Sequence, residues 1–526
     1  MHAMLRRLAF GSSLLVVVLG CSDSSDPKPD PEPEQKSRYA PTVFPPLGDA
    51  PTTAERTIVV RTPRANPNQG PNPALPDALA DYLARGFGEF DLGPGDAYVT
   101  RVMDEGEQPP PPGPNAKRLV RFAHLADLQL ADDESPTRLG QFDGEGPTSS
   151  ALRPQDAYLC HMANAAVRTI NALHAKDPIA FTLMGGDNAD SAQTNEVEWV
   201  LDILSGAESV ECDSGDDDDI VEGPDNDGKD PFKAEGLEMP WKWVTGNHDV
   251  LIQGNFVVDD EQRQKVLDVV ATGGTRRYDN GLKGLVERGD FVIPDPKRAL
   301  LSGHELMAKV GGHGDGHGIG QAEIESGRAT YTFDVDGTPL RFLVIDTAHP
   351  NGASEGVITQ GEIDRVIKPL LDKAKADGKW VVLSSHHGVF SLSDGTGLGG
   401  TKAPDALTAE QWKTFVGQYD NVLFSMVGHS HRHRVEAIKP ESGHPWWEVM
   451  TAAIADYPHQ FRIVEIFDQD NGWVMLRATA VDFSTEGDPI ALEGKKRGIV
   501  DFTSGWLPAD DVEAHHKNVE VWIRKP

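Results

Sequence analysis

Five apolar runs in this chain end directly in Asp, Asn or His, and runs of this kind are typical of buried strands. The pattern predicts strands that end near residues 125, 183, 245, 385 and 427. It also predicts helices over about residues 155–175 and 360–376, a hairpin around residues 336–339, and a closing set of antiparallel strands at residues 447–451, 461–467 and 473–478. In open α/β sheets the carboxyl ends of the strands meet at one edge, where ligands bind. The polar residues after the five runs are therefore expected to lie close together.

These polar residues carry the oxygen and nitrogen donors that bind metal ions. The last two, His429 and His431, are two residues apart, so both side chains can leave one face of a strand. The runs are followed, in chain order, by Asp127 and Gln129, Asp187 and Asp190, Asn247 and His248, His386 and His387, and His429 and His431.

The ordered motifs resemble those of the calcineurin-like metallophosphoesterase superfamily, over about residues 117–482. This superfamily includes protein phosphatases, purple acid phosphatases, nucleotidases and phosphodiesterases. The first motif departs from the family pattern, because Asp127-Leu128-Gln129 stands where the family has Asp-x-His. The chain therefore resembles an exported bacterial lipoprotein member with a D-x-Q first motif. The resemblance implies an α/β fold, a four-layer α/β/β/α sandwich of two mixed sheets.

The resemblance also implies two metal ions, bridged by Asp187. Mixed carboxylate, amide and imidazole ligands favour Fe, Mn, Zn or Co. A hydroxide between the two ions would attack phosphorus while both ions polarise the phosphoryl oxygens. One ion would be held by Asp127, Gln129 and His431, and the other by Asn247, His386 and His429.

Further roles follow from the same resemblance. His248 would donate a proton to the leaving alkoxide, and Asp190 would orient it and raise its pKa. His387 is expected to stay outside the ligand set, because the family ligand resembles the first His of the pair. Arg138 is a candidate for a bidentate contact with a substrate phosphate, with a solvated surface position as the alternative. In the glycine-rich stretch of residues 311–318, His317 is the favoured substrate contact.

Charge narrows the class of substrate. The 526 residues carry a formal net charge of −33, so long nucleic acids and anionic membrane surfaces would be repelled. A content of 38% hydrophobic and 7% aromatic residues is enough to bury one large core or two ordinary ones. A small phosphate ester is therefore the expected partner.

The N-terminus predicts export. Arg6 and Arg7 precede an apolar run, and residues 1–20 are expected to be a lipoprotein signal peptide cut before Cys21. The lipid on Cys21 would be the only membrane anchor, which places the protein in the bacterial cell envelope, in the periplasm or on the outer surface. An ordinary secretory signal is the alternative. Cys160 and Cys212 can pair or remain separate thiols.

Composition divides the rest of the chain. Residues 21–55 are expected to be a disordered tether, and residues 56–115 an extension that packs on the main domain. Residues 116–485 form the expected metallophosphoesterase domain, with an acidic insertion at about 208–230 that partly resembles a calcium loop but is better explained as solvated. Residues 486–526 are expected to be a polar C-terminal tail.

The function predicted from these features is hydrolysis of a phosphoric ester at a dinuclear metal centre. The ligands do not distinguish a phosphomonoesterase from a phosphodiesterase. One alternative is a catalytically weakened binding or scaffold lipoprotein, since Gln129 is a weaker ligand than His. Another alternative is a nucleotidase or nuclease for phosphate scavenging.

Overall fold

The computed structural model describes residues 40–66, 70–104, 106–140, 143, 150–215, 229–269, 275–276, 285–286, 292–506 and 512–526. All of them belong to one compact unit, Ser37–Pro526. The expected signal peptide, Cys21 and the first part of the expected tether lie outside the described residues. Residues 216–228, which hold most of the acidic insertion and the calcium-like run, also lie outside them.

Two mixed sheets form the centre of the fold. The six-stranded sheet has the order β13–β14–β12–β11–β10–β9, and the seven-stranded sheet has the order β3–β17–β16–β15–β4–β5–β6. The strands of the six-stranded sheet are β9 (Tyr331–Asp334), β10 (Leu340–Val344), β11 (Trp380–Ser384), β12 (Val422–Val427), β13 (Arg434–Ile438) and β14 (Trp446–Met450). Those of the seven-stranded sheet are β3 (Val99–Val102), β4 (Lys117–Leu125), β5 (Thr182–Met184), β6 (Trp241–Lys242), β15 (Gln460–Asp468), β16 (Trp473–Asp482) and β17 (Val519–Arg524).

Strand pairing follows the sequence pattern with one exception. The hairpin expected around residues 336–339 is confirmed, since β9 and β10 pair antiparallel, and β15 pairs antiparallel with β16. The segment 447–451, expected to belong to that antiparallel set, lies in the other sheet as β14. There it pairs antiparallel with β13 and parallel with β12, and its side chains are buried on both faces, as is usual for a strand inside a mixed or parallel sheet.

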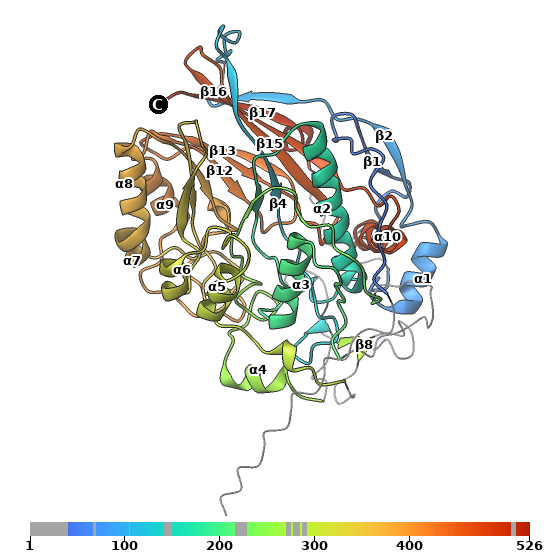
Figure 1. Ribbon diagram of the computed structural model, residues 1–526. Coiled ribbons are helices and arrows are strands. Elements are labelled where there is room, and N and C mark those ends of the chain that lie inside the picture. The colour runs from blue at the N-terminus through green and yellow to red at the C-terminus, as the bar shows by residue number, and fades with distance from the viewer. Residues whose placement is uncertain are drawn as a thin grey trace, which may run out of the picture. The chain divides into compact units, whose positions relative to one another are not determined.

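Helices cover the outer face of each sheet. Figure 1 shows α8 (Lys368–Ala376) and α9 (Ala409–Val416) beside β12 and β13, and α2 (Leu159–Lys176) and α10 (Pro489–Thr503) beyond β4 and β15. Between the sheets, the ring of Phe122 on β4 packs edge-on against Phe342 on β10, with centroids 5.3 Å apart. Apolar residues from both sheets form one continuous core there. The structure therefore has the expected α/β/β/α layers.

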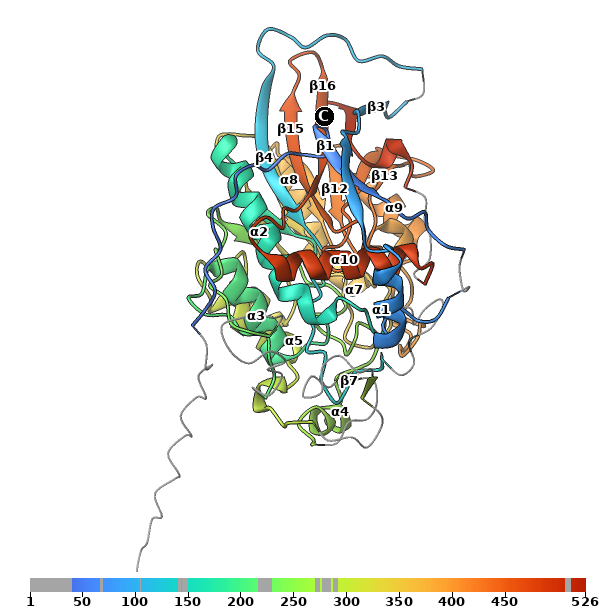
Figure 2. The same ribbon diagram turned by 90° about the vertical axis from the view of Figure 1, so that its right-hand side faces the viewer.

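The remaining elements are short. None of the described helices is long and apolar enough to cross a membrane. Figure 2 shows α10 running in front of the strands, beside α1 and α2. The other helices are α1 (Pro76–Ala84), α3 (Thr194–Ser205), α4 (Asp260–Lys265), α5 (Gly303–Gly311), α6 (Gln321–Ser326) and α7 (Gln360–Glu362), and the other strands are β1 (Arg56–Val60), β2 (Phe90–Pro94), β7 (Thr275–Arg276) and β8 (Leu285–Val286).

The domain extends further in both directions than the expected range 116–485. At the N-terminal side, Ala50 and Thr53 are buried, and Thr53 Oγ1 donates to Ala480 O at 2.8 Å, although both residues fall in the expected tether. At the C-terminal side, the expected tail contains α10 and β17. Asp488 caps α10 by accepting from Ala491 N at 2.8 Å, and β17 joins β16 and β3.

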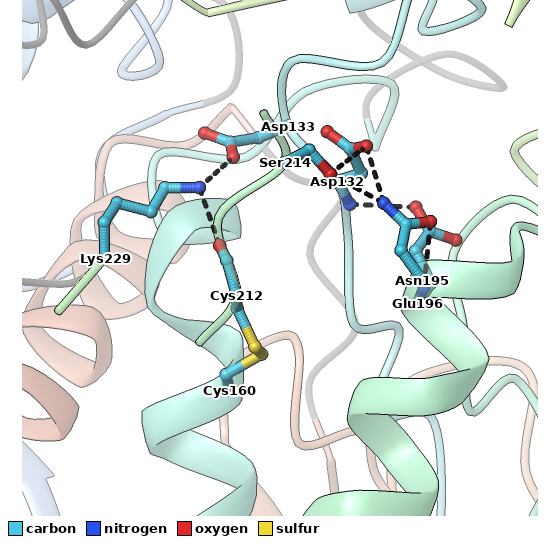
Figure 3. The surroundings of a disulfide bond; sticks show 8 residues. All are labelled: Asp132, Asp133, Cys160, Asn195, Glu196, Cys212, Ser214 and Lys229. Atoms are coloured by element: carbon cyan, nitrogen blue, oxygen red, sulfur yellow. Dashed lines mark hydrogen bonds and ion pairs between the residues drawn. A yellow bond between two sulfur atoms is a disulfide. The ribbon is translucent and has the colours of Figure 1, made fainter. Parts of the chain in front are cut away.

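A disulfide joins Cys160 on α2 to Cys212, with Cα atoms 6.6 Å apart. Figure 3 shows that Lys229 lies beside it, where its ammonium group donates to Cys212 O at 3.0 Å and to Asp133 Oδ1 at 2.8 Å. Asp132 Oδ2 accepts from Ser214 Oγ at 2.7 Å. The disulfide thus ties the first part of the acidic insertion to α2, and the hydrogen bonds of Ser214 and Lys229 tie it to the loop that follows β4.

Candidate metal centre

Strands from both sheets deliver the side chains of the candidate metal centre. Those that follow β4, β5, β6, β11 and β12 are, in that order, Asp127, Asp187, Asn247, His386 and His429. Backbone hydrogen bonds join the strand ends, since Asp127 N donates to Gly186 O at 3.0 Å and Gly428 N donates to His386 O at 2.9 Å. The five loops therefore form one hydrogen-bonded framework.

The backbone of this framework is strained at the candidate ligands. A left-handed conformation of a non-glycine residue costs on the order of 1–3 kcal/mol, and it persists only where the surroundings impose it. The loops after β5 and β6 also approach closely, since a Cβ atom on Gly246 would lie only 2.3 Å from the backbone nitrogen of Asp187. Positive φ angles occur at Asp127 (53°), Gln129 (45°), Asp187 (51°), His429 (76°) and His431 (55°).

Asp127, Asp187 and His386 form the first ligand cluster, with donor atoms within 4.8 Å of one another. His386 Nε2 lies 2.9 Å from Asp187 Oδ2 and 3.9 Å from Asp127 Oδ1, and Nδ1 lies 2.7 Å from Gly185 O. Because Nδ1 must carry a hydrogen to donate to that carbonyl, Nε2 is the atom that faces the carboxylates. All three side chains are buried.

His429 and Asn247 extend this cluster. Donor atoms of His386, His387 and His429 also lie within 4.8 Å of one another. His387, however, uses both ring nitrogens elsewhere, since Nδ1 lies 2.8 Å from Thr347 Oγ1 and Nε2 lies 2.8 Å from Ser354 O and 3.1 Å from Asn247 Oδ1. His387 therefore orients Asn247, and burial lowers the pKa of His429 to about 3, which keeps that imidazole neutral and able to ligate.

His431 and Gln129 lie on the other side of Asp127. His431 Nε2 is 3.4 Å from Asp127 Oδ1, and its Nδ1 is 2.5 Å from Asp456 Oδ2. Such a carboxylate fixes the orientation of a ligating imidazole. Gln129 Oε1, the only atom of that amide able to ligate, accepts from Arg153 Nη2 at 2.7 Å. A buried guanidinium thus stands beside one half of the centre, where it opposes a cation electrostatically.

The charges within the cluster compensate one another. Burial alone would lower the pKa of His386, but Asp187 and Asp127 raise it to about 9. In the same way Asp127 and Asp456 outweigh burial at His431 and raise its pKa to about 10. The pKa of Asp187 is lowered despite burial, because the imidazoles around it stabilise its anion. In the metal-free chain, protons on the histidines therefore take the place of cations.

His248 lies at the edge of this cluster. Its backbone N donates to Asp187 Oδ1 at 2.8 Å, and its ring Nδ1 lies 2.8 Å from Asp190 O and 3.2 Å from Asp190 Oδ1. Burial would lower the pKa of His248, but Asp187 and Asp190 outweigh it, so the pKa is raised. Donation from Nδ1 leaves Nε2 to carry the proton that can be transferred.

Arg138 and His317 lie elsewhere than the sequence suggested. Arg138 is buried and pairs with Asp190 at 2.9 Å and Asp156 at 2.7 Å, so it supports the residue behind His248 and does not face a substrate. His317 packs on the ring of Trp241, with centroids 3.3 Å apart and planes 9° apart. It is not among the residues that line the cavity over the centre.

Asp249, the last residue of the Gly-Asn-His-Asp motif, fixes the loops from within. Its carboxylate accepts from the backbone N–H groups of Gly246, Asn188 and Ala189 at 2.8–3.0 Å. Burial and the nearby Asp187 raise its pKa to about 7. Asp249 thus holds the loops after β5 and β6 together, and no role had been assigned to it from the sequence.

A cavity of about 670 Å³ opens over the centre. Its floor contains six of the candidate residues, namely Gln129, Asp187, Asn247, His248, His429 and His431. A cavity of this size is in the range that holds small organic ligands. A substrate in it can reach the ligand cluster and His248 at the same time.

The residues fit a bound metal ion. His386 Nε2 is buried and has no hydrogen-bond partner among the described residues, although it lies 2.9 Å from a carboxylate oxygen. A shared cation satisfies such a pair of atoms without a linear hydrogen bond. Carboxylate, imidazole and amide donors are also the mixture that borderline divalent ions prefer.

Comparisons with known proteins give structural likeness only. No family model matches the chain, and no curated protein matches it. A dimetal phosphatase from Danio rerio is similar over 70% of this chain and 100% of its own, with 12% identity and a TM-score of 0.38. A purple acid phosphatase from yellow lupin (Lupinus luteus) seeds is similar over 76% of this chain and 55% of its own, with 13% identity and a TM-score of 0.29. A 5'-nucleotidase from Candida albicans is similar over 75% and 58%, with 12% identity and a TM-score of 0.27. Likeness at this level says nothing of activity.

Proposed function

We propose that this chain is a metal-dependent phosphoric ester hydrolase with a dinuclear centre. The observation that carries the proposal is the convergence of five strand ends on one buried ligand cluster at the floor of a 670 Å³ cavity. The motif resemblance of residues 117–482 points to the same chemistry. One ion would be held by Asp127, Gln129 and His431, the other by Asn247, His386 and His429, with Asp187 between them.

The chain supplies the rest of the reaction. When bound, a pair of divalent ions activates water and polarises the phosphoryl oxygens. His248 faces the cavity and gives its Nε2 proton to the leaving oxygen, and the backbone carbonyl of Asp190 keeps the opposite nitrogen protonated. The carboxylate of Asp190 stabilises the imidazolium form, and Arg138 holds that carboxylate in place.

The test combines metal analysis with a substrate panel. Purified protein is expected to hold about two ions per chain and to hydrolyse at least one class of phosphate mono- or diester. His248→Ala is expected to lower turnover by about 10² or more, whereas His304→Ala, which removes an exposed histidine on α5, is the matched control and is expected to keep it. Wild-type protein that binds no metal ion, or His248→Ala with unchanged turnover, would refute the proposal.

One observation favours a second candidate, a binding module with weakened catalysis. Arg153 contacts the oxygen through which Gln129 would ligate, and its positive charge disfavours an ion in that half of the centre. This candidate predicts near-zero wild-type turnover together with retained binding of a phosphate ester. Substantial wild-type turnover would exclude it.

The expected location completes the proposal. A lipid on Cys21 would place the hydrolase in the bacterial cell envelope, where a small phosphate ester can reach it from solution. Mass spectrometry of the N-terminal peptide from membrane-associated protein tests the lipid directly. An unmodified N-terminal peptide would leave the hydrolase without this anchor.

A further inference from the structure

Much of the cavity wall comes from segments outside the five ligand-bearing strand ends. Thr57 and Ile58 on β1 line it, and both are fixed to the end of β16, since Thr57 Oγ1 and Ile58 N donate to Asp482 Oδ2 at 2.9 and 3.1 Å. Phe502 on α10 and Lys517, which precedes β17, line it from the C-terminal side. The segments to which the sequence assigned no function therefore shape the space above the centre.

Two aromatic rings form a stacked pair in this wall. Tyr457 and Phe502 have ring centroids 4.2 Å apart and planes 20° apart, and both line the cavity and remain partly exposed. Arg64 lies 5.1 Å from the centroid of the Phe502 ring, and its Nε donates to Phe502 O at 2.9 Å. Arg64 therefore holds this pair in place, and the pair can offer a fixed planar surface to a ligand.

This pair is also close to the centre along the chain. Tyr457 directly follows Asp456, whose carboxylate lies 2.5 Å from His431 Nδ1. A ligand whose phosphate reaches His431 and His248 can therefore extend its other end toward Tyr457 within the same 670 Å³ cavity.

We propose that the cavity takes a phosphate monoester whose alcohol part carries a planar aromatic ring, and that this ring stacks on Tyr457 with Phe502 behind it. The inference rests on the proposed hydrolase function and specifies its substrate class. In the reaction one water is consumed: its oxygen bonds to phosphorus and releases one proton to solvent, the bond from phosphorus to the alcohol oxygen breaks, and that oxygen takes a proton from His248. His248 then regains a proton from solvent. A nucleobase and a simple aryl group share the required chemistry.

The test compares substrates that differ only in the ring. Adenosine 5'-monophosphate and ribose 5-phosphate have the same primary alcohol as leaving group, so the chemical step is matched. Stacking of a base on an aromatic side chain is worth roughly tenfold or more in affinity. The wild type is therefore expected to prefer the nucleotide by about tenfold in kcat/KM, mainly through KM. A second pair, 2-phenylethyl phosphate and propyl phosphate, separates a simple aryl preference from a nucleobase preference.

Variants of Tyr457 test whether its ring causes the preference for adenosine 5'-monophosphate. Tyr457→Leu is expected to bring the ratio for the two sugar phosphates close to one, while Tyr457→Phe keeps it. Phe390→Leu is the matched control, because Phe390 is an exposed aromatic residue (59%) that does not line the cavity. Tyr457→Leu is expected to raise KM for adenosine 5'-monophosphate more than KM for ribose 5-phosphate, a selective loss that a fault in folding would not produce.

Each outcome decides between the two proposals. No hydrolysis of any ester by the wild type refutes the proposed function itself. Equal kcat/KM for both members of both pairs refutes the aromatic subsite and leaves the hydrolase standing. Equal losses on both sugar phosphates in Tyr457→Leu also refute it. Should Tyr457→Leu not fold, inhibition of the wild type by adenosine but not by ribose supports the subsite, and equal inhibition overturns it.

Discussion

Replacing Asp190 by Asn is expected to move the alkaline limb of the pH profile of kcat/KM to lower pH. In this variant the backbone carbonyl of residue 190 still accepts from His248 Nδ1 at 2.8 Å and keeps the ring oriented. Only the carboxylate 3.2 Å from the same nitrogen is neutralised. The raised pKa of His248 keeps the imidazolium form present to higher pH, so activity that needs this acid falls as pH rises through that pKa.

The size of the shift follows from the contacts of the carboxylate. Two unit charges about 4 Å apart interact by about 4 kcal/mol at an effective dielectric constant of about 20. Arg138 lies 2.9 Å from the other oxygen of Asp190 and offsets most of that interaction. Bound ions would also offset the charge of Asp187, which leaves Asp190 as the carboxylate acting on the ring. We therefore expect a shift of about one pH unit, or ~1.4 kcal/mol.

The assay is kcat/KM against pH for an alkyl phosphate, whose leaving oxygen needs a proton. Asp156→Asn is the matched control, because Asp156 binds the same Arg138 at 2.7 Å but has no recorded contact with His248. The control is expected to leave the limb in place. An unmoved limb in Asp190→Asn, or an equal shift in both variants, would show that His248 does not titrate in this limb.

Three further predictions test the centre and its surroundings. Cys160 and Cys212 are 52 residues apart, so replacing both by Ala is expected to lower the free energy of unfolding by about 4 kcal/mol, and an unchanged urea midpoint would contradict this. Metal uptake above pH 7 is expected to release protons, because the pKa values of His386 and His431 are about 9 and about 10. Calorimetry in buffers of different ionisation enthalpy measures this release. If no protons are released, these histidines are not ligands. Gln129→Glu puts a carboxylate beside Arg153 and is expected to lower the dissociation constant of an ion bound at residue 129 at least about tenfold. A metal titration that shows no change would refute this.

Most strands and helices of the fold can be predicted from hydrophobic periodicity and from the polar residues that follow the apolar runs. Strands that end in a polar ligand were visible because each apolar run is continuous and short, and the helix over residues 360–376 was visible from its apolar stripe. The C-terminal part was missed, although Asp488-Pro489 is a helix-start signal and β17 alternates apolar and polar residues at its beginning. The polar composition of residues 486–526 masks those signals.

The supporting residues of the centre could not be found in the same way. Arg153 and Asp456 are 303 residues apart in number, yet Arg153 Nε lies 2.9 Å from Asp456 Oδ1, and no local pattern marks such a contact. Arg138 was assigned to the substrate because it follows a ligand in a polar loop. That loop is instead buried, and Arg138 pairs there with Asp156 and Asp190, since a buried charge is costly unless it is paired.

The buried charges explain why this arrangement persists before any ion arrives. Asp156, Asp190 and Asp456 lie behind the centre, and Arg138 and Arg153 join them into one ion-pair network. Removing one partner of such a network leaves an uncompensated buried charge, which is strongly destabilising. The network therefore fixes His248 through Asp190 and His431 through Asp456 at the same time. It also brings Arg153 against Gln129, so the contacts that hold the candidate centre rigid also place a positive charge beside Gln129.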